Sequence, residues 1–259
     1  MSVENISTST VTTFHRHWSP IIEVTNFVAS HCRQPTNPYR TVLEIGPGTV
    51  PFPPATLFIG CNEKIEHYTR VDIDKERFPY DDQSIDFVYC RHVLEDIQNP
   101  DFAMQEIIRI SKHGGYIETP SPLVEITKNV DSSEFSYLYC GYIHHRYIVW
   151  GNMQKNELYF LPKYSCILDH LLQSNQNNHY ALLNSQPILW NNYFLFTTPP
   201  TVIVYKNGVN FNVNSSSVMQ MVTEYADLVS RAVQESIENT NYFILLRSAV
   251  NDSNPFIDL

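Results

Sequence analysis

The sequence lacks any long apolar run. Of its 259 residues 43% are hydrophobic, but no stretch approaches the roughly 20 consecutive apolar residues that cross a bilayer. The first residues, Met1 to Asn5, have neither the basic flank nor the apolar core of a secretory signal. We therefore expect no membrane association and a cytoplasmic location.

Paired cysteines and clustered basic residues are also missing. The five cysteines are widely spaced and include no Cys-x-x-Cys pair, so we expect free thiols. A formal net charge of −10 disfavours tight binding to nucleic acid, which requires Lys and Arg to neutralise phosphates. The partner classes that remain are a small molecule, a glycan and a protein.

An alternation of predicted strands and helices is present instead. Apolar segments at 41–45, 84–90 and 115–119 read as strands, and residues 100–110 have helical spacing before Gly114-Gly115, a typical C-cap. A further helix is predicted over Pro20 to Cys32. The pattern predicts an α/β fold, a Rossmann-like doubly wound and mostly parallel sheet in a single domain.

The character of the chain changes after about residue 180. Residues 193–196 and 201–205 are rich in β-branched and aromatic side chains and flank Thr197 to Pro200, so they are predicted to form a hairpin. Ser215 to Ser217 then cap a long predicted helix, and a last apolar run follows at 242–246. Antiparallel C-terminal strands are therefore expected beside the parallel ones.

A glycine turn, Gly46-Pro47-Gly48, follows directly after the first of these strands. Such a turn lets the backbone come close to a ligand, and the amides of a following helix can face a carboxylate or a phosphate. The same pattern also occurs at ordinary tight turns, so it needs support from other motifs.

Further motifs follow the glycine turn in a fixed order. They are Val42 to Gly48, Phe78 to Val88, Val93 to Ile97, Glu106 to Ile110 and Gly114-Gly115. This order resembles the class I S-adenosylmethionine (SAM)-dependent methyltransferases that act on small molecules. The resemblance covers residues 40–120 and continues more loosely through Glu118 to Pro122 and His144 to Tyr147.

The resemblance implies the domain organisation and the residues that bind SAM. Residues 1–39 are expected to be a helical lead-in, and 40–259 the methyltransferase domain with an acceptor-side insertion at about 120–165. One departure from the family pattern is Val50, which stands where the third small residue of the glycine loop is expected. The implied cofactor-binding residues around the first and fourth strands are Glu44, Gly46, Pro47, Gly48, Cys90 and Arg91.

The acid that binds the ribose has two possible positions. Asp72 can end the second strand, or residues 56–59 can be that strand, which places Asn62 at the ribose and Asp74 by the adenine amino group. The second register needs no missing strand and is preferred. Asn62 would bind the ribose more weakly than a carboxylate does, and both aspartates are also common turn formers.

Transfer to a hydroxyl group requires a base, for which histidine suits neutral pH. The candidates are His145 first, then His144 and His92. Equally, His144 and His145 can bond to loop carbonyls or acids. We expect no metal site, because adjacent residues in an extended chain point opposite ways, and His15 and His17 have no third ligand nearby.

The sequence therefore predicts a SAM-dependent methyltransferase that acts on a hydroxyl of a small molecule or sugar, without a nucleic-acid partner. The alternative is a non-catalytic SAM-binding or interaction module with the same fold, which Val50 and the uncertain ribose acid favour. A dinucleotide oxidoreductase is a remote option, since the Gly-x-Gly-x-x-Gly spacing is absent.

Overall fold

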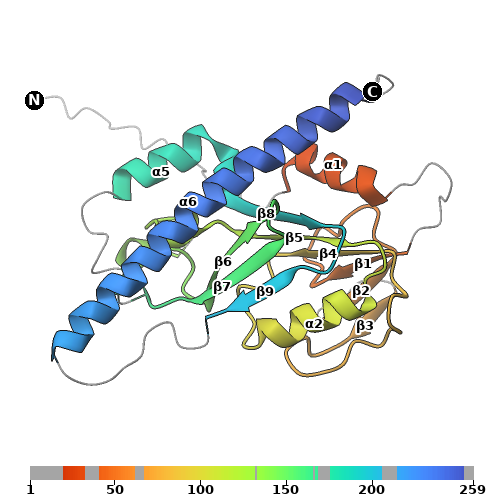
Figure 1. Cartoon of the computed structure of the whole chain (residues 1–259), viewed down its shortest axis with the longest axis horizontal. Helices are drawn as coiled ribbons and strands as arrows, with labels where there is room; N and C mark the ends of the chain where they lie inside the picture. The colour runs from red at the N-terminus through yellow and green to blue at the C-terminus, as the bar shows by residue number, and fades with distance from the viewer. Residues whose placement is uncertain are drawn as a thin grey trace, which may run out of the picture.

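The computed structural model describes residues 20–32, 41–61, 67–131, 133–165, 167–168, 176–205 and 215–253. Two sheets are formed within these residues (Figure 1). The larger has the strand order β3-β2-β1-β4-β5-β8, and the smaller has the order β6-β7-β9. In the larger sheet every neighbouring pair is parallel except β5 with β8. The Rossmann-like, mostly parallel fold expected from the sequence is confirmed.

The elements have the following bounds. The strands are β1 (Val42–Ile45), β2 (Leu57–Gly60), β3 (Tyr68–Arg70), β4 (Phe87–Arg91), β5 (Gly115–Pro120), β6 (Tyr147–Asn152), β7 (Glu157–Pro162), β8 (Asn191–Phe196) and β9 (Thr201–Val204). The helices are α1 (Ile22–Cys32), α2 (Pro100–Ile110), α3 (Pro122–Glu125), α5 (Gln176–Ser185) and α6 (Ser215–Ser253), with 3₁₀ turns η1 (Ser136–Leu138) and η2 (Pro187–Trp190). None of the described helices is long and apolar enough to cross a membrane.

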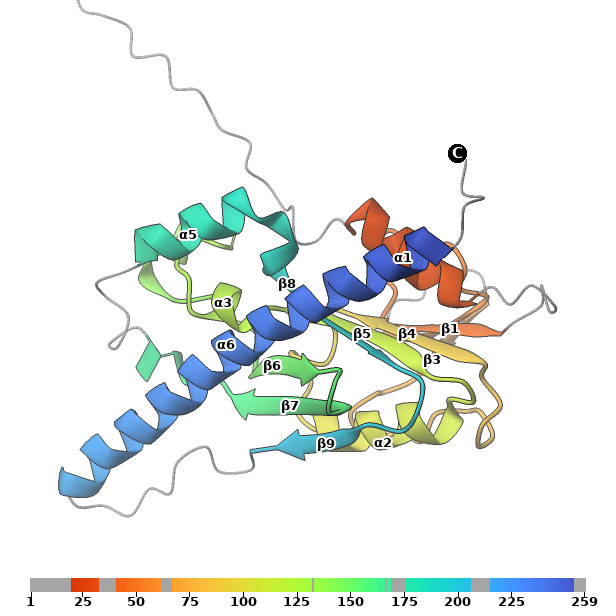
Figure 2. The same ribbon diagram turned by 45° about the horizontal axis from the view of Figure 1, so that its top comes forward.

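The larger sheet is covered on both faces because successive side chains of a strand point to opposite sides. In β1, Val42 packs in one cluster with residues of α1 and α6, while Leu43 and Ile45 pack in another with α2, β6 and β7. Figure 2 shows α1 and α6 above the sheet and α2 below it. Burial on both faces explains why these strands read as nearly continuous apolar runs.

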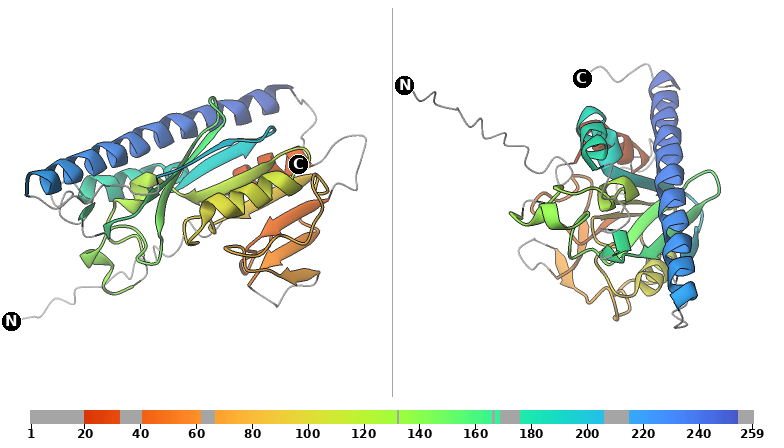
Figure 3. Two further views of the ribbon diagram at one scale, coloured as in Figure 1. Left: turned by 60° about the horizontal axis from the view of Figure 1, so that its bottom comes forward. Right: turned by 90° about the vertical axis from the view of Figure 1, so that its left-hand side faces the viewer.

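The smaller sheet corrects the hairpin predicted for residues 193–205. Strand β8 pairs antiparallel with β5, whereas β9 pairs parallel with β7. The intervening residues 197–200 end in two prolines, which cannot donate ladder hydrogen bonds, and they carry the chain from one sheet to the other. The long helix α6 runs along both sheets (Figure 3), and it includes the apolar run 242–246 that was expected to follow it.

The predicted C-terminal cap of one helix is also corrected. Helix α2 spans the predicted residues, but its C-cap is Ser111 in an extended conformation. Gly114 has φ +116° in the turn before β5, where an added Cβ would lie 2.0 Å from the carbonyl oxygen of Phe196. The glycine is therefore needed for close packing against β8 rather than for capping the helix.

Candidate functional site

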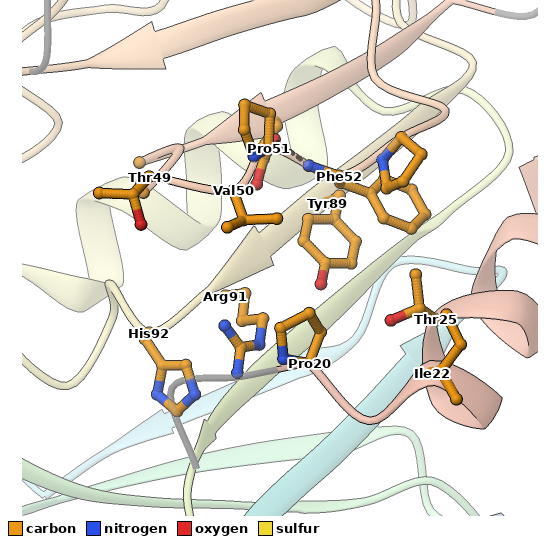
Figure 4. A pocket seen from close by; sticks show the side chains of 14 residues that line it. Pro20, Ile22, Thr25, Thr49, Val50, Pro51, Phe52, Tyr89, Arg91 and His92 are labelled. Atoms are coloured by element: carbon orange, nitrogen blue, oxygen red, sulfur yellow. Dashed lines mark hydrogen bonds between the residues drawn. The ribbon is translucent and has the colours of Figure 1, made fainter. Parts of the chain in front are cut away.

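A cavity of about 660 Å³ opens at the carboxyl ends of β1 and β4. These neighbouring strands are the point where the strand order of the sheet reverses, which is where open α/β sheets bind their ligands. Figure 4 shows Thr49, Val50 and Pro51 along one side, with Pro20, Ile22 and Thr25 across from them. The size of the cavity suits a ligand of nucleoside dimensions.

The glycine turn forms part of the cavity wall through Gly46 and Gly48, and Pro47 between them is buried. Gly46 has φ +66°, and a Cβ added there would lie 2.4 Å from Cγ2 of Val93. At Gly48, by contrast, no atom of the described residues other than its chain neighbours lies within 4 Å of the Cβ position. The fold therefore requires a glycine at the first position but not at the second.

The helix expected after the glycine turn is absent. Residues 46–56 form turns and irregular chain that lead directly into β2. Proline at 47, 51, 53 and 54 explains this, because proline lacks the amide hydrogen of a helical ladder. On this side the cavity is consequently lined by a loop, and the helix that contributes to its lining is α1, through its first turn.

Glu44 lies at the base of the cavity, buried to 4% exposure. One carboxylate oxygen accepts a hydrogen bond of 2.8 Å from the amide of Phe52. Burial raises the pKa of Glu44 to about 7, against the opposing effects of this hydrogen bond and of Arg91. Glu44 is thus poised to lose its proton when a positive group enters the cavity.

Arg91 at the end of β4 is held by a buried polar network. Its Nε lies 2.9 Å from Oε1 of Glu118 on β5, which also accepts a hydrogen bond from Asn191. The hydroxyl of Tyr116 donates to the other carboxylate oxygen of Glu118 at 2.6 Å. Burial alone would lower the pKa of Arg91. The charge and hydrogen bond of Glu118, together with Tyr89 and Tyr116, outweigh burial, so the pKa is raised. The guanidinium is a fixed positive charge in the cavity wall.

Of the three histidines predicted as bases, His92 lines the cavity, beside Arg91 (Figure 4). Its Nδ1 lies 3.4 Å from Oε1 of Glu95, and its Nε2 lies 3.8 Å from Oε1 of Glu118. Its φ of +54° belongs to the left-handed region, which is uncommon for a residue with a side chain. Such strain is concentrated at functional sites.

A second polar group lies beyond His92, away from the described cavity lining, and we call it the ionic cluster. Nδ1 of His145 lies 2.5 Å from Oε1 of Glu125, and Nζ of Lys163 lies 2.6 Å from Oε2 of the same residue. Burial opposes the ionisation of Glu125, yet Lys163 and His145 hold its pKa at about 2. The ionic cluster consists of Glu95, Asp96, Glu125, His144, His145 and Lys163.

The arrangement of His144 and His145 corrects the reason given for excluding a metal. The two residues lie in a turn closed by a 3.2 Å hydrogen bond from the amide of His145 to the carbonyl of Tyr142, so the chain is not extended. Their rings are 4.5 Å apart, and the Nε2 atom of each lies 3.9 Å from Oδ1 of Asp96. Both histidines therefore point to one acid.

The remaining predicted residues lie apart from the cavity lining. Cys90 is buried in the core cluster on the opposite face of β4. Asp72 and Asp74 follow β3 rather than β2, which confirms the preferred register. Asp72 caps a turn through the amide of Asp74, and Asp74 accepts hydrogen bonds from the amides of Gln98 and Asn99. Asn62 lies outside the described residues, as do His15 and His17.

Three parts of the site carry no recognisable signal in the sequence. The first turn of α1 forms a cavity wall, and Ile22 there is 63% exposed. Phe52 and Tyr89 stack with ring centroids 4.0 Å apart. Glu125, the last residue of α3, meets Lys163, which directly follows β7, across 38 positions of the chain. All three depend on contacts between segments, which a local sequence pattern does not encode.

One part of this chain matches the model of a known protein family. Residues 55–118 match the family model of a methyltransferase domain, which confirms the resemblance drawn from the motifs over that segment. The match begins after the glycine turn. No curated protein matches the chain.

Two solved structures of similar proteins are SAM-dependent methyltransferases. One, from Thermotoga maritima and described as a possible histamine N-methyltransferase, is 24% identical, with 38% of this chain and 50% of that chain covered and a TM-score of 0.28. The other, from Mesorhizobium loti, is 10% identical, with 71% and 72% covered and a TM-score of 0.30. This chain thus spans about half the length of the first protein.

Proposed function

We propose that this chain, whose residues 55–118 match a methyltransferase domain, is a class I SAM-dependent methyltransferase that transfers a methyl group to a hydroxyl of a small molecule or sugar. The observation that carries the proposal is the cavity at the switch point of the parallel sheet, with Glu44, Gly48 and Arg91 in its wall.

The space at Gly48 fits a ligand that approaches the backbone closely. The described residues leave the Cβ position of Gly48 open, so their packing gives no reason for a glycine there. A ligand lying against the loop would supply that reason. Gly46 and Gly48 would hold the methionine end of SAM.

The charges in the cavity wall match the two charges of that methionine end. Glu44 would bind the ammonium group, which offsets the cost of ionising a buried carboxyl. Arg91 would bind the carboxylate, since a guanidinium is suited to carboxylate geometry. The two side chains lie in the same cavity and interact electrostatically, as binding to the two ends of one amino acid requires.

When bound, SAM supplies a methyl group on a positively charged sulfur that is open to in-line displacement. The chain must align the acceptor and exclude water. The stacked rings of Phe52 and Tyr89 and the apolar side chains of Ile22 and Val50 provide a largely apolar wall. An acceptor of small size suits the volume of the cavity.

His92 is the side chain that we assign as base. With the proton on Nδ1, which lies 3.4 Å from Oε1 of Glu95, Nε2 keeps the lone pair that takes the proton of the acceptor hydroxyl. Glu95 and Glu118 on either side of the ring stabilise the charge that the imidazole then carries. His145, the first choice from the sequence, is completely buried in the ionic cluster and does not belong to the described cavity lining.

A second candidate function is a module that binds SAM without turnover. It is favoured by Val50, which is 70% exposed on the loop, and by the absence of a helix after the glycine turn. Fewer amides are then available to hold the cofactor. Binding without transfer to any acceptor would be its signature.

Incubation of the full chain with methyl-labelled SAM and a panel of sugars, nucleotide sugars and small alcohols tests the proposal. We expect transfer to at least one hydroxyl, and about 10²- to 10⁴-fold slower transfer by His92→Gln with retained binding of S-adenosylhomocysteine. His113→Gln is the matched control, because His113 lies beside Asp86 away from the cavity lining. Absence of transfer to every acceptor, with binding intact, would favour the binding module.

A further inference from the structure

The three residues Asp96, His144 and His145 bring one ligand atom each to a common point. Oδ1 of Asp96 and the Nε2 atoms of both histidines all lie within 4.8 Å of one another. They come from the segment after β4 and from the turn before β6. Two imidazoles and a carboxylate that face a common point are a typical set of metal ligands.

The ring of His145 is oriented in the way that metal ligands usually are. Its Nδ1 is bonded to Glu125, which Lys163 holds in turn. A carboxylate on one ring nitrogen fixes the ring and leaves the other nitrogen to bind the ion. Nε2 of His145 thus faces Asp96 with its position already set.

Two of the three ligand atoms, those of Asp96 and His145, are buried without a hydrogen-bond partner among the described residues. The side chain of His145 has 0% exposure, and neither its Nε2 nor Oδ1 of Asp96 makes a hydrogen bond with any described residue. Both carboxylate oxygens of the neighbouring Glu95 are likewise buried and make no hydrogen bond with a described residue. Buried polar atoms are nearly always satisfied, so these atoms indicate a group that protein atoms do not supply.

The charges of the ionic cluster indicate that this group is a cation. Three carboxylates, those of Glu95, Asp96 and Glu125, meet within it. Among the described residues, Lys163 is the one Lys or Arg whose side chain forms an ion pair with any of the three. Glu95 and Asp96 therefore have no permanent positive partner among the described residues, and keeping both ionised where water is excluded would require one.

We propose that Asp96, His144 and His145 bind one divalent transition-metal ion, with Zn²⁺ as the representative. Ligands at about 2.1 Å from such an ion stand about 3.4 Å apart in tetrahedral geometry. The observed 3.9 Å separations close by a small movement of His144 and Asp96, whose side chains are 50% and 37% exposed. Their exposure also leaves a coordination position open to solvent.

The ligand set selects the class of ion. Imidazole nitrogens suit zinc, iron, cobalt and nickel, whereas magnesium and calcium take oxygen ligands. Mg²⁺ in excess is therefore expected not to compete for the site. The proposal stands on this geometry alone and does not depend on the binding of SAM.

Zinc titration of the chelator-treated full chain tests the site. We expect a single equivalent of tightly bound Zn²⁺, measured by competition with a chromophoric chelator, and visible d–d absorption when Co²⁺ replaces it. The titration is done in a His15→Ala, His17→Ala background, because those two histidines offer a separate pair. His144→Ala and Asp96→Asn should each weaken binding by at least about tenfold.

The matched control is His113→Ala, a histidine with 43% side-chain exposure beside Asp86, which should bind Zn²⁺ as the parent does. Glu125→Gln, which keeps the shape of the side chain, should weaken binding about 10- to 100-fold through the orientation of His145. No zinc uptake by the parent, or equal uptake by the parent, His144→Ala and Asp96→Asn, would overturn the proposal. None of these measurements involves methyl transfer, so the two proposals fail separately.

Discussion

The cavity and the ionic cluster are both built from buried polar side chains near the end of β4, but they are organised differently. In the cavity, Glu44 is bonded to the amide of Phe52 and Arg91 is bonded to Glu118. In the ionic cluster, Glu125 is satisfied by two partners while the oxygens of Glu95 have none among the described residues.

The difference indicates that burial serves ligand binding in the cavity and stability in the ionic cluster. The cavity keeps space free beside Glu44 and Arg91, which are held in place by hydrogen bonds with Phe52 and Glu118, so a charged ligand can enter and pair with them. In the ionic cluster the charged groups contact one another directly, so the removal of one group leaves its partner buried and unpaired. Removal of a charge from the ionic cluster should therefore cost the most stability, and changes of the side chains that face the cavity should cost binding.

The largest loss of stability is expected for Lys163→Met. The substitution removes the ammonium group from Glu125, whose side chain is 1% exposed, and leaves a buried carboxylate with only His145. Breaking a buried ion pair from one side costs about 3–5 kcal/mol. Urea denaturation of the variant at neutral pH measures this loss.

The double variant Lys163→Met, Glu125→Gln is the control for that prediction. It removes both charges, so most of the lost stability should return. A single variant that costs less than about 1 kcal/mol would show that the pair is solvated, and the contrast between cluster and cavity would then fail.

A smaller loss of about 2–4 kcal/mol is expected for Gly46→Ala. The residue has φ +66°, and the new methyl group would lie 2.4 Å from Cγ2 of Val93, so backbone strain and overpacking add together. Thermal and urea denaturation measure it. An unchanged free energy of unfolding would mean that the turn rearranges easily, contrary to a rigid cavity wall.

Glu44→Gln is expected to stabilise the protein at pH 8. The pKa of Glu44 is raised in the folded state from 4.5 to about 7. Between these values the folded protein holds a proton that the unfolded chain has released, so stability falls as pH rises through this window and is level above it. The effect is on the order of 2 kcal/mol.

Unfolding free energies from pH 5 to pH 8 check the sign for Glu44. The wild type should lose stability over this range more steeply than Glu44→Gln, whose amide oxygen still accepts from Phe52. The variant should also bind SAM more weakly. A variant that is less stable at pH 8 and binds SAM equally well would refute the role of Glu44 as a buried acid kept for a ligand.

The parallel sheet could be predicted from the sequence because its signals are local. Strand β1 with its glycine turn and helix α2 are each encoded within about a dozen residues. Apolar periodicity and turn residues are sufficient for such elements.

The second sheet and the ionic cluster could not be predicted because their contacts join distant segments. Strand β9 pairs with β7 rather than with β8, its neighbour in sequence. The residues of the pair Glu125 and Lys163 are 38 positions apart. The periodicity of apolar residues does not indicate which distant segments will contact each other. The assumption of an extended chain at His144 and His145 was wrong because a turn forms there.

The smallest change in stability, within about 0.5 kcal/mol, is expected for Gly48→Ala, since no described residue beyond its chain neighbours has an atom within 4 Å of the new methyl group. The same methyl group would occupy the space that we assign to the methionine end of SAM. The variant therefore separates a requirement of the fold from a requirement of the ligand.

Calorimetric titration of the wild type and Gly48→Ala with S-adenosylhomocysteine is the most direct test of the cavity as a SAM site. We predict binding of a single equivalent to the wild type and at least about tenfold weaker binding to Gly48→Ala, at equal stability. Absence of binding to the wild type at millimolar ligand, or equal affinity of the two proteins, would contradict it.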